Sequence, residues 1–182
     1  MQLKASSMLF IMLLIFISVL GCSQQVFVSD EVIRDTDVID TADVYANVGG
    51  GAMSSLQITD PAQVREVTSL LEGIEIKEFS TSQLTKLFES DGFTRNVDYQ
   101  ISLLAYSKFD STDPSEVLKG GVIVLNDGNL LFLNPETVIH SPDPLSETDP
   151  TVTYYYITTK KQPEIIARLV AIIEDNKSNE GI

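Results

Sequence analysis

Apolar and polar residues alternate with a period of two along several stretches of the chain, which predicts β-strands. The clearest stretch runs from Val97 to Tyr106, where every second residue from Val97 to Ala105 is apolar. The tetrapeptide Asn126-Asp127-Gly128-Asn129 predicts a tight hairpin between two strands. The remaining predicted strands are residues 43–48, 54–58, 74–79, 121–125, 130–133 and 151–158.

Three glycines, residues 49–51, stand between the first two of these strands. They predict a hairpin or a bulge. A phosphate-binding loop is the less favoured interpretation, because neither a Lys-Ser/Thr pair nor a helix follows.

Apolar residues at helical spacing predict two well-defined helices and a third, shorter one. Asp60 and Pro61 form a typical helix start, and Gly73 is placed to end that helix. The last helix is predicted over Pro163–Asp175, and the shorter one over Ser80–Glu89. Ile166, Leu169, Val170 and Ile173 form the predicted core face of the last helix.

The predicted strands follow one another instead of alternating with helices. This order predicts an α+β fold, with an antiparallel sheet of about five to seven strands and two or three helices packed on one face. Residues 44–175 are expected to form a single domain. Residues 22–43 are expected to be an acidic tether, in which residues 26–28 can pair as an edge strand, and residues 176–182 a frayed tail.

An uncharged apolar run, Met8–Leu20, stands near the N-terminus and is preceded by Lys4. Its thirteen residues are too few to cross the hydrocarbon core, which takes roughly 20 residues as a helix. The length instead fits the core of a signal peptide. The run leads into Val19-Leu20-Gly21-Cys22, and Cys22 is the only cysteine of the chain.

These residues resemble the lipobox of bacterial lipoproteins. The resemblance implies a diacylglyceryl group on the sulfur of Cys22 and signal-peptide cleavage between Gly21 and Cys22. The mature chain would then be held by its acyl chains, palmitate among them, on the outer side of the cell membrane. The alternative is a secreted protein with a free thiol.

Three further features resemble small lipoproteins of Gram-positive bacteria whose exported domain has no assigned activity. They are the helix start at residues 58–61, the strand start at residues 97–99, and the tyrosine-rich strand before the last helix. The resemblance implies an α+β domain and transfers no site residues.

The chain contains 26 acidic and 12 basic residues, which gives a net charge of −14. Loss of residues 1–21 would remove one basic residue, Lys4, and would change the net charge to −15. Such a charge excludes nucleic acid as a partner and a basic membrane-binding face. An envelope protein or a basic partner is compatible with it. A single cysteine excludes an intrachain disulfide, thiol redox catalysis and cysteine-rich metal sites.

Candidate metal ligands are sparse. Asp35, Asp37 and Asp40 lack the order and the closing Glu of an EF-hand loop, so a solvated acidic linker is the favoured interpretation. His140, the only histidine, lies in a predicted polar loop over Asn134–Pro150 and is expected at the surface. Neither a metal nor a cofactor is predicted.

In a strand, Tyr154 and Tyr156 would share one face and Tyr155 would take the other. One of these faces is expected to pack in the core, which is the favoured interpretation of the tyrosines. The alternative is a binding surface formed by these tyrosines and His140. The favoured hypothesis is a non-enzymatic, lipid-anchored binding domain. The alternative is an envelope-acting hydrolase that uses paired carboxylates, with Asp98, Asp110 and Asp113 as candidates.

Overall fold

The computed structural model describes residues 25–47, 53–88, 96–109, 113–140 and 154–180. They form one eight-stranded sheet in the order β1-β4-β8-β7-β6-β5-β2-β3, and each neighbouring pair is antiparallel. The strands are β1 (Val26–Val28), β2 (Thr41–Asn47), β3 (Met53–Ile58), β4 (Glu75–Phe79), β5 (Val97–Leu104), β6 (Leu118–Leu125), β7 (Leu130–Leu133) and β8 (Tyr155–Thr158). The α+β class and the antiparallel sheet are confirmed. The predicted strand count was too low, because three-residue β1 lies within the predicted tether.

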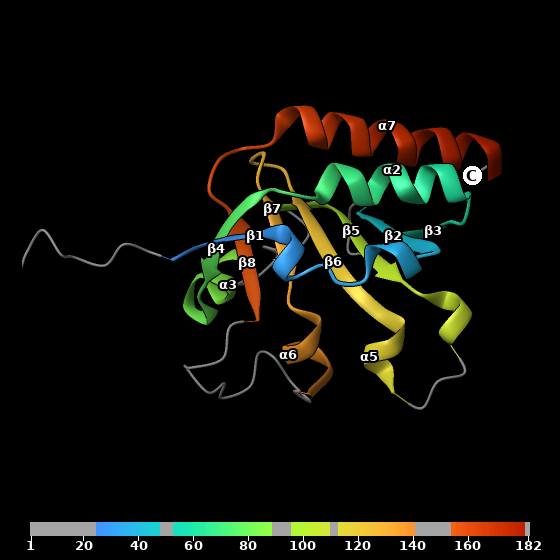
Figure 1. Cartoon of the computed structure of the whole chain (residues 1–182). Helices are drawn as coiled ribbons and strands as arrows, with labels where there is room; N and C mark the ends of the chain where they lie inside the picture. The colour runs from blue at the N-terminus through green and yellow to red at the C-terminus, as the bar shows by residue number, and fades with distance from the viewer. Residues whose placement is uncertain (1–24, 48–52, 89–95, 110–112, 141–153, 181–182) are drawn as a thin grey trace, which may run out of the picture.

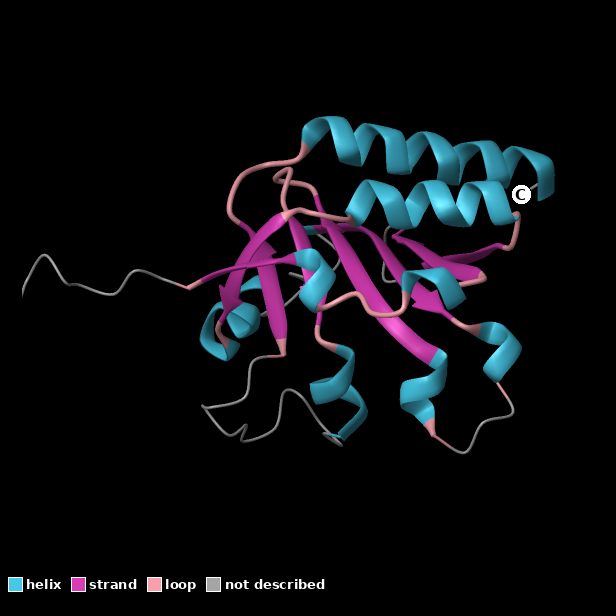
Figure 2. Ribbon diagram, viewed as in Figure 1, coloured by secondary structure: helices cyan, strands magenta, loops and turns pink. Residues whose placement is uncertain are grey.

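Two helices, α2 (Pro61–Leu71) and α7 (Pro163–Glu180), lie side by side along one face of the sheet (Figures 1 and 2). Val67 of α2 and Leu169 of α7 are buried in the main core with sheet residues such as Phe132.

The shorter helix α3 (Thr81–Phe88) covers part of the opposite face. Its Leu84 is buried against Ile123 and Leu131. The prediction that all helices pack on one face was therefore wrong. Strand β6 is apolar on both faces, with Val122 and Val124 on one side and Ile123 and Leu125 on the other, so its second face also needs a cover.

The predicted ends of the first helix are confirmed. The Asp60 carboxylate accepts hydrogen bonds from the backbone N–H of Ala62 and Gln63, each at 3.0 Å. Gly73 follows the helix with φ +67°, a conformation that favours glycine. The hairpin over residues 126–129 is also confirmed, because β6 and β7 pair directly on either side of it.

The last helix continues to Glu180, five residues beyond its predicted end at Asp175. The Tyr99 hydroxyl donates to Glu174 at 3.0 Å, and the Lys177 ammonium donates to the same carboxylate at 2.8 Å. Burial and this hydrogen bond raise the pKa of Tyr99 to about 12. The predicted tail is therefore helical over most of its length. Tyr99 of β5 bonds to the helix just before this tail, and the local sequence does not reveal that contact.

The predicted tether is part of the folded domain from Val26 onward. Between β1 and β2, residues 29–40 cross the sheet on the same face as α2, and we name this segment the strap (Figure 1). The strap contains the short 3-10 helices η1 (Ser29–Glu31) and η2 (Thr36–Val38). Val32, Ile33 and Ile39 of the strap are buried in the main core. Gly120 of β6 permits this approach, since a Cβ there would lie 3.1 Å from Ile33 Cγ1.

None of the helices in the described ranges is both long enough and apolar enough to cross a membrane.

Candidate functional site

The start of the strap closes the turn between α2 and β4. The Ser29 side chain is fully buried, and its hydroxyl donates to the Leu71 carbonyl at 2.6 Å and accepts from the Ile74 N–H at 3.0 Å. Next to it, the Asp30 carboxylate accepts from the Gly73 N–H at 2.8 Å. These bonds satisfy backbone groups that the end of α2 would otherwise leave unpaired.

The middle of the strap is held by β6 and by helix α6 (Pro135–His140). The Arg34 N–H donates to the Lys119 carbonyl at 3.0 Å, and its guanidinium pairs with Glu136 of α6. The Lys119 ammonium lies 3.1 Å from Asp35 Oδ2. Asp35 has φ +49°, a left-handed conformation that is uncommon outside glycine.

The end of the strap is fixed by Asp40. Its carboxylate accepts from the N–H groups of Tyr106 at 2.7 Å and Ser107 at 2.9 Å, and from the Thr41 hydroxyl at 3.0 Å. Burial alone would raise the pKa of Asp40, but the hydrogen bonds outweigh it and lower the pKa. Asp40 thereby caps the 3-10 helix η3 (Tyr106–Lys108) from a distant part of the chain.

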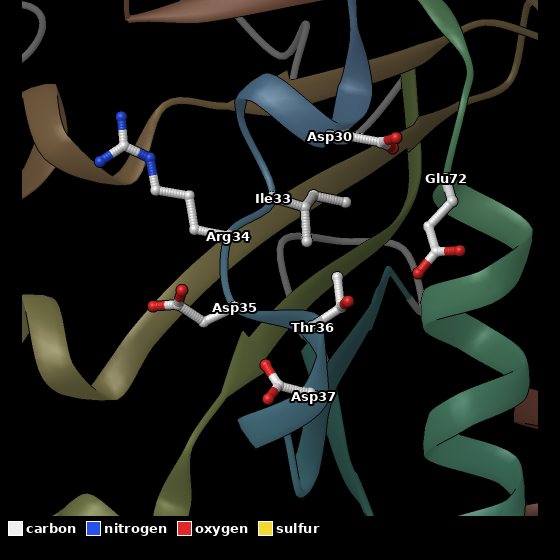
Figure 3. A pocket seen from close by; sticks show the side chains of 7 residues that line it. All are labelled: Asp30, Ile33, Arg34, Asp35, Thr36, Asp37 and Glu72. Atoms are coloured by element: carbon white, nitrogen blue, oxygen red, sulfur yellow. The ribbon is translucent and has the colours of Figure 1, made fainter.

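An open hollow of about 430 Å³ lies between the strap and the end of α2, and we name it the acidic hollow. Figure 3 shows Asp30 and Glu72 on its two sides, and Arg34 directed away from Glu72. All its charged side chains are exposed to solvent. Its lining consists of Asp30, Ile33, Arg34, Asp35, Thr36, Asp37 and Glu72.

A smaller hollow of about 210 Å³ lies on the other side of the strap. It is bordered by α6 and by the short helix α5 (Pro114–Val117). Arg34 and Asp35 line both hollows, so the left-handed turn of the strap forms the ridge between them.

An exposed aromatic pair lies next to the end of the strap. The rings of Tyr106 and Phe109 stack with centroids 5.1 Å apart, although the two residues are 46% and 63% exposed. Asp40 joins them to the strap, on which Val38 is a further exposed apolar residue. Exposed aromatic groups of this kind are enriched in protein interfaces.

The structure does not gather the three predicted tyrosines into one exposed surface. Tyr154 is only 7% exposed. Tyr156 packs against the main core, with its ring 5.2 Å from that of Phe27, whereas Tyr155 packs on the opposite face beside α3. Both sheet faces are covered around β8, which explains this burial.

His140 is the last residue of α6, and its side chain lies outside the described residues. The predicted loop over Asn134–Pro150 therefore begins with a helix. Pro135 and Glu136 occupy its first turn, a favoured helix start that the sequence analysis missed.

Two of the three proposed carboxylates, Asp98 and Asp113, lie near opposite ends of β5. Asp98 is the second residue of β5. Asp113 precedes α5, and α5 leads into the start of β6, which pairs with Leu104 at the other end of β5. Six residues of strand, or roughly 20 Å, separate these ends. Asp110 lies outside the described residues, as do Gly21 and Cys22.

The calcium interpretation finds no support in the described part of the chain. There, no group of three or more His, Cys, Asp or Glu residues is placed to hold a metal ion. Asp35 and Asp40 are instead engaged by Lys119 and by the backbone of η3.

Comparison of the chain with protein-family models, curated proteins and solved structures finds no match. The geometry of the strap and its surroundings is therefore the main guide to function.

Sequence reasoning missed the acidic hollow because residues 30–37 were assigned to a tether. The available signal was the apolar pair Val32-Ile33 within an acidic stretch, which indicates a buried segment.

Proposed function

We propose that this protein is a lipid-anchored extracytoplasmic binding protein, whose domain captures a basic segment of a partner protein without catalysing a reaction. The observation that supports this most directly is the acidic hollow; the exposed aromatic pair offers a second, apolar contact area. The anchor is inferred from the lipobox-like residues that end at Cys22.

Charge complementarity favours a basic partner. Four carboxylates line the hollow. Lys119 pairs with Asp35 and Arg34 pairs with Glu136, so Asp30, Asp37 and Glu72 carry the remaining negative charge of the lining. The C-terminal end of α2 adds a partial negative charge beside Glu72. A lysine or arginine side chain of the partner would occupy the hollow, and an apolar side chain elsewhere in the partner would contact Tyr106 and Phe109.

Exposure of the carboxylates favours binding over hydrolysis. A catalytic carboxylic acid requires a site that withdraws it from water. Asp30, Asp35, Asp37 and Glu72 are all exposed. Exposed charges of this kind act chiefly on the association rate and on its salt dependence.

Site-specific crosslinking in cells tests the proposal. A photoreactive phenylalanine analogue at Thr36, inside the hollow, is expected to crosslink a protein with a basic segment. The same analogue at the exposed Ser55 of β3 is the matched control.

For the partner so identified, the double substitution Asp37→Asn and Glu72→Gln is expected to weaken binding about tenfold, equivalent to about 1.4 kcal/mol, and to reduce its salt dependence. Glu164→Gln, at an exposed position of α7, should leave the affinity unchanged. Equal crosslinking from Thr36 and Ser55, or equal loss of affinity in the control variant, would contradict the proposal.

A further inference from the structure

The distance between the lipid-modified residue and the domain is short. Only residues 23–25 separate Cys22 from Val26, where β1 begins. Four residue steps span at most about 14 Å when fully extended. The anchor proposed above, on which this inference rests, would therefore hold the start of β1 at the membrane surface.

The position of β1 in the sheet determines which edge of the sheet lies beside the anchor. Strands β1 and β3 are the two outermost of the eight strands. Seven strand spacings of about 4.8 Å place these edges roughly 34 Å apart. An anchor of about 14 Å reaches only the β1 edge, so the β3 edge is not held at the membrane by the anchor.

The exposed face of β1 is apolar. Val26 and Val28 project on one side and are 56% and 40% exposed, whereas Phe27 turns into the main core. Val26 pairs with Lys77 of β4 and Val28 pairs with Glu75, so one basic and one acidic residue lie beside the two valines; the Lys77 ammonium suits the phosphate level of a bilayer. Small apolar groups beside a lipid anchor add favourable burial at the interface.

The edge of β1 is also closed to strand pairing at one point. The Val28 N–H donates to the Glu31 carboxylate at 3.1 Å, so this donor is not available to an added strand. The edge is therefore less suited to pairing with another protein strand.

We propose that the β1 edge, through Val26 and Val28, rests on the outer surface of the membrane and that the β3 edge points away from it. The net charge of −15 after removal of residues 1–21 disfavours closer approach of the rest of the domain to anionic lipids. The contact is confined to the edge beside the anchor.

Depth-dependent quenching tests this orientation in the full chain, expressed in a bacterium that processes lipoproteins and reconstituted into phosphatidylcholine vesicles. The single variants Val28→Cys and Ser55→Cys are labelled with a thiol-reactive NBD fluorophore. Quenching of the NBD fluorescence by lipids that carry a spin label in the headgroup region is then compared between the two variants. A thioether at Cys22 does not react with the label. We expect quenching at residue 28 to exceed that at residue 55 at least threefold, and Val26→Cys to behave like Val28→Cys.

A longer tether supplies the control. Insertion of a flexible Gly-Ser segment of about twenty residues between Gln25 and Val26 relaxes the geometric constraint. Quenching at residue 28 should then fall toward that at residue 55. Equal quenching at both positions without the insertion would overturn the orientation and leave the anchor intact. Labelling of Cys22 itself in the unsubstituted chain would overturn the anchor, and the orientation with it.

Discussion

Single polar side chains fix the two ends of the strap. Ser29 can be buried because its hydroxyl bonds to the Leu71 carbonyl and the Ile74 N–H, which therefore need no water as a partner. Asp40 does the same for the first N–H groups of η3. Neither role can be read from the local sequence, because the bonded backbone groups lie 42 to 67 residues away along the chain.

Replacement of Asp40 by Asn should destabilise the domain in a pH-dependent manner. Hydrogen bonds to a carboxylate contribute about 1–3 kcal/mol, so the free energy of unfolding should fall by about that amount at pH 7. Because the folded state lowers the pKa of Asp40 below its ordinary value of 3.8, this stabilisation is present above that pH. It is lost as the pH falls through the lower, folded-state value.

Urea unfolding at pH 7 and at decreasing pH provides the measurement. The difference in the free energy of unfolding between the Asp40→Asn variant and the unsubstituted protein should become smaller below pH 3.8. Asp98→Asn, at an exposed position of β5, is the matched control. If this difference in unfolding free energy stays constant with pH, or if Asp98→Asn shows the same difference, then the Asp40 carboxylate does not stabilise η3.

At the scale of elements, periodic segments were predicted well and irregular ones poorly. The helix after Asp60 and the hairpin over residues 126–129 follow from local capping and turn chemistry. The strap was missed because its buried residues are separated by acidic ones without a regular period. The extension of α7 depends on Tyr99, which lies 75 residues before Glu174.

The fit between the strap and β6 can be tested with Gly120→Ala. The added Cβ would lie 3.1 Å from Ile33 Cγ1 and 3.4 Å from Ile33 Cα, so the strap must shift by a few tenths of an ångström. We expect a loss of about 1–2 kcal/mol in the free energy of unfolding, which is typical of modest overpacking. Faster amide hydrogen exchange should appear at Arg34, which bonds the neighbouring Lys119.

Ser102→Ala, on the neighbouring strand β5, is a control for handling and expression. If Gly120→Ala unfolds at the same urea concentration as the unsubstituted protein, then close packing of the strap on β6 does not contribute to stability.

At the scale of the whole molecule, the order of strands and helices was sufficient to predict the α+β class. It could not predict the acidic hollow, because that site joins the strap to Glu72 at the end of α2. The hollow exists only once Ser29 and Asp30 have brought the strap to that helix end. The short distance from Cys22 to β1 likewise became evident only when the predicted tether proved to be folded.

The lipid anchor at Cys22 is the claim on which both the cellular location and the orientation of the domain depend. Mass spectrometry of the N-terminal peptide, from protein purified out of bacterial membranes, tests it most directly. We expect a peptide that begins at Cys22 and carries the mass of a diacylglyceryl group, and no such peptide from a Cys22→Ala variant. An unmodified Cys22 peptide, or one still joined to Gly21, would show that Cys22 is not a lipid anchor.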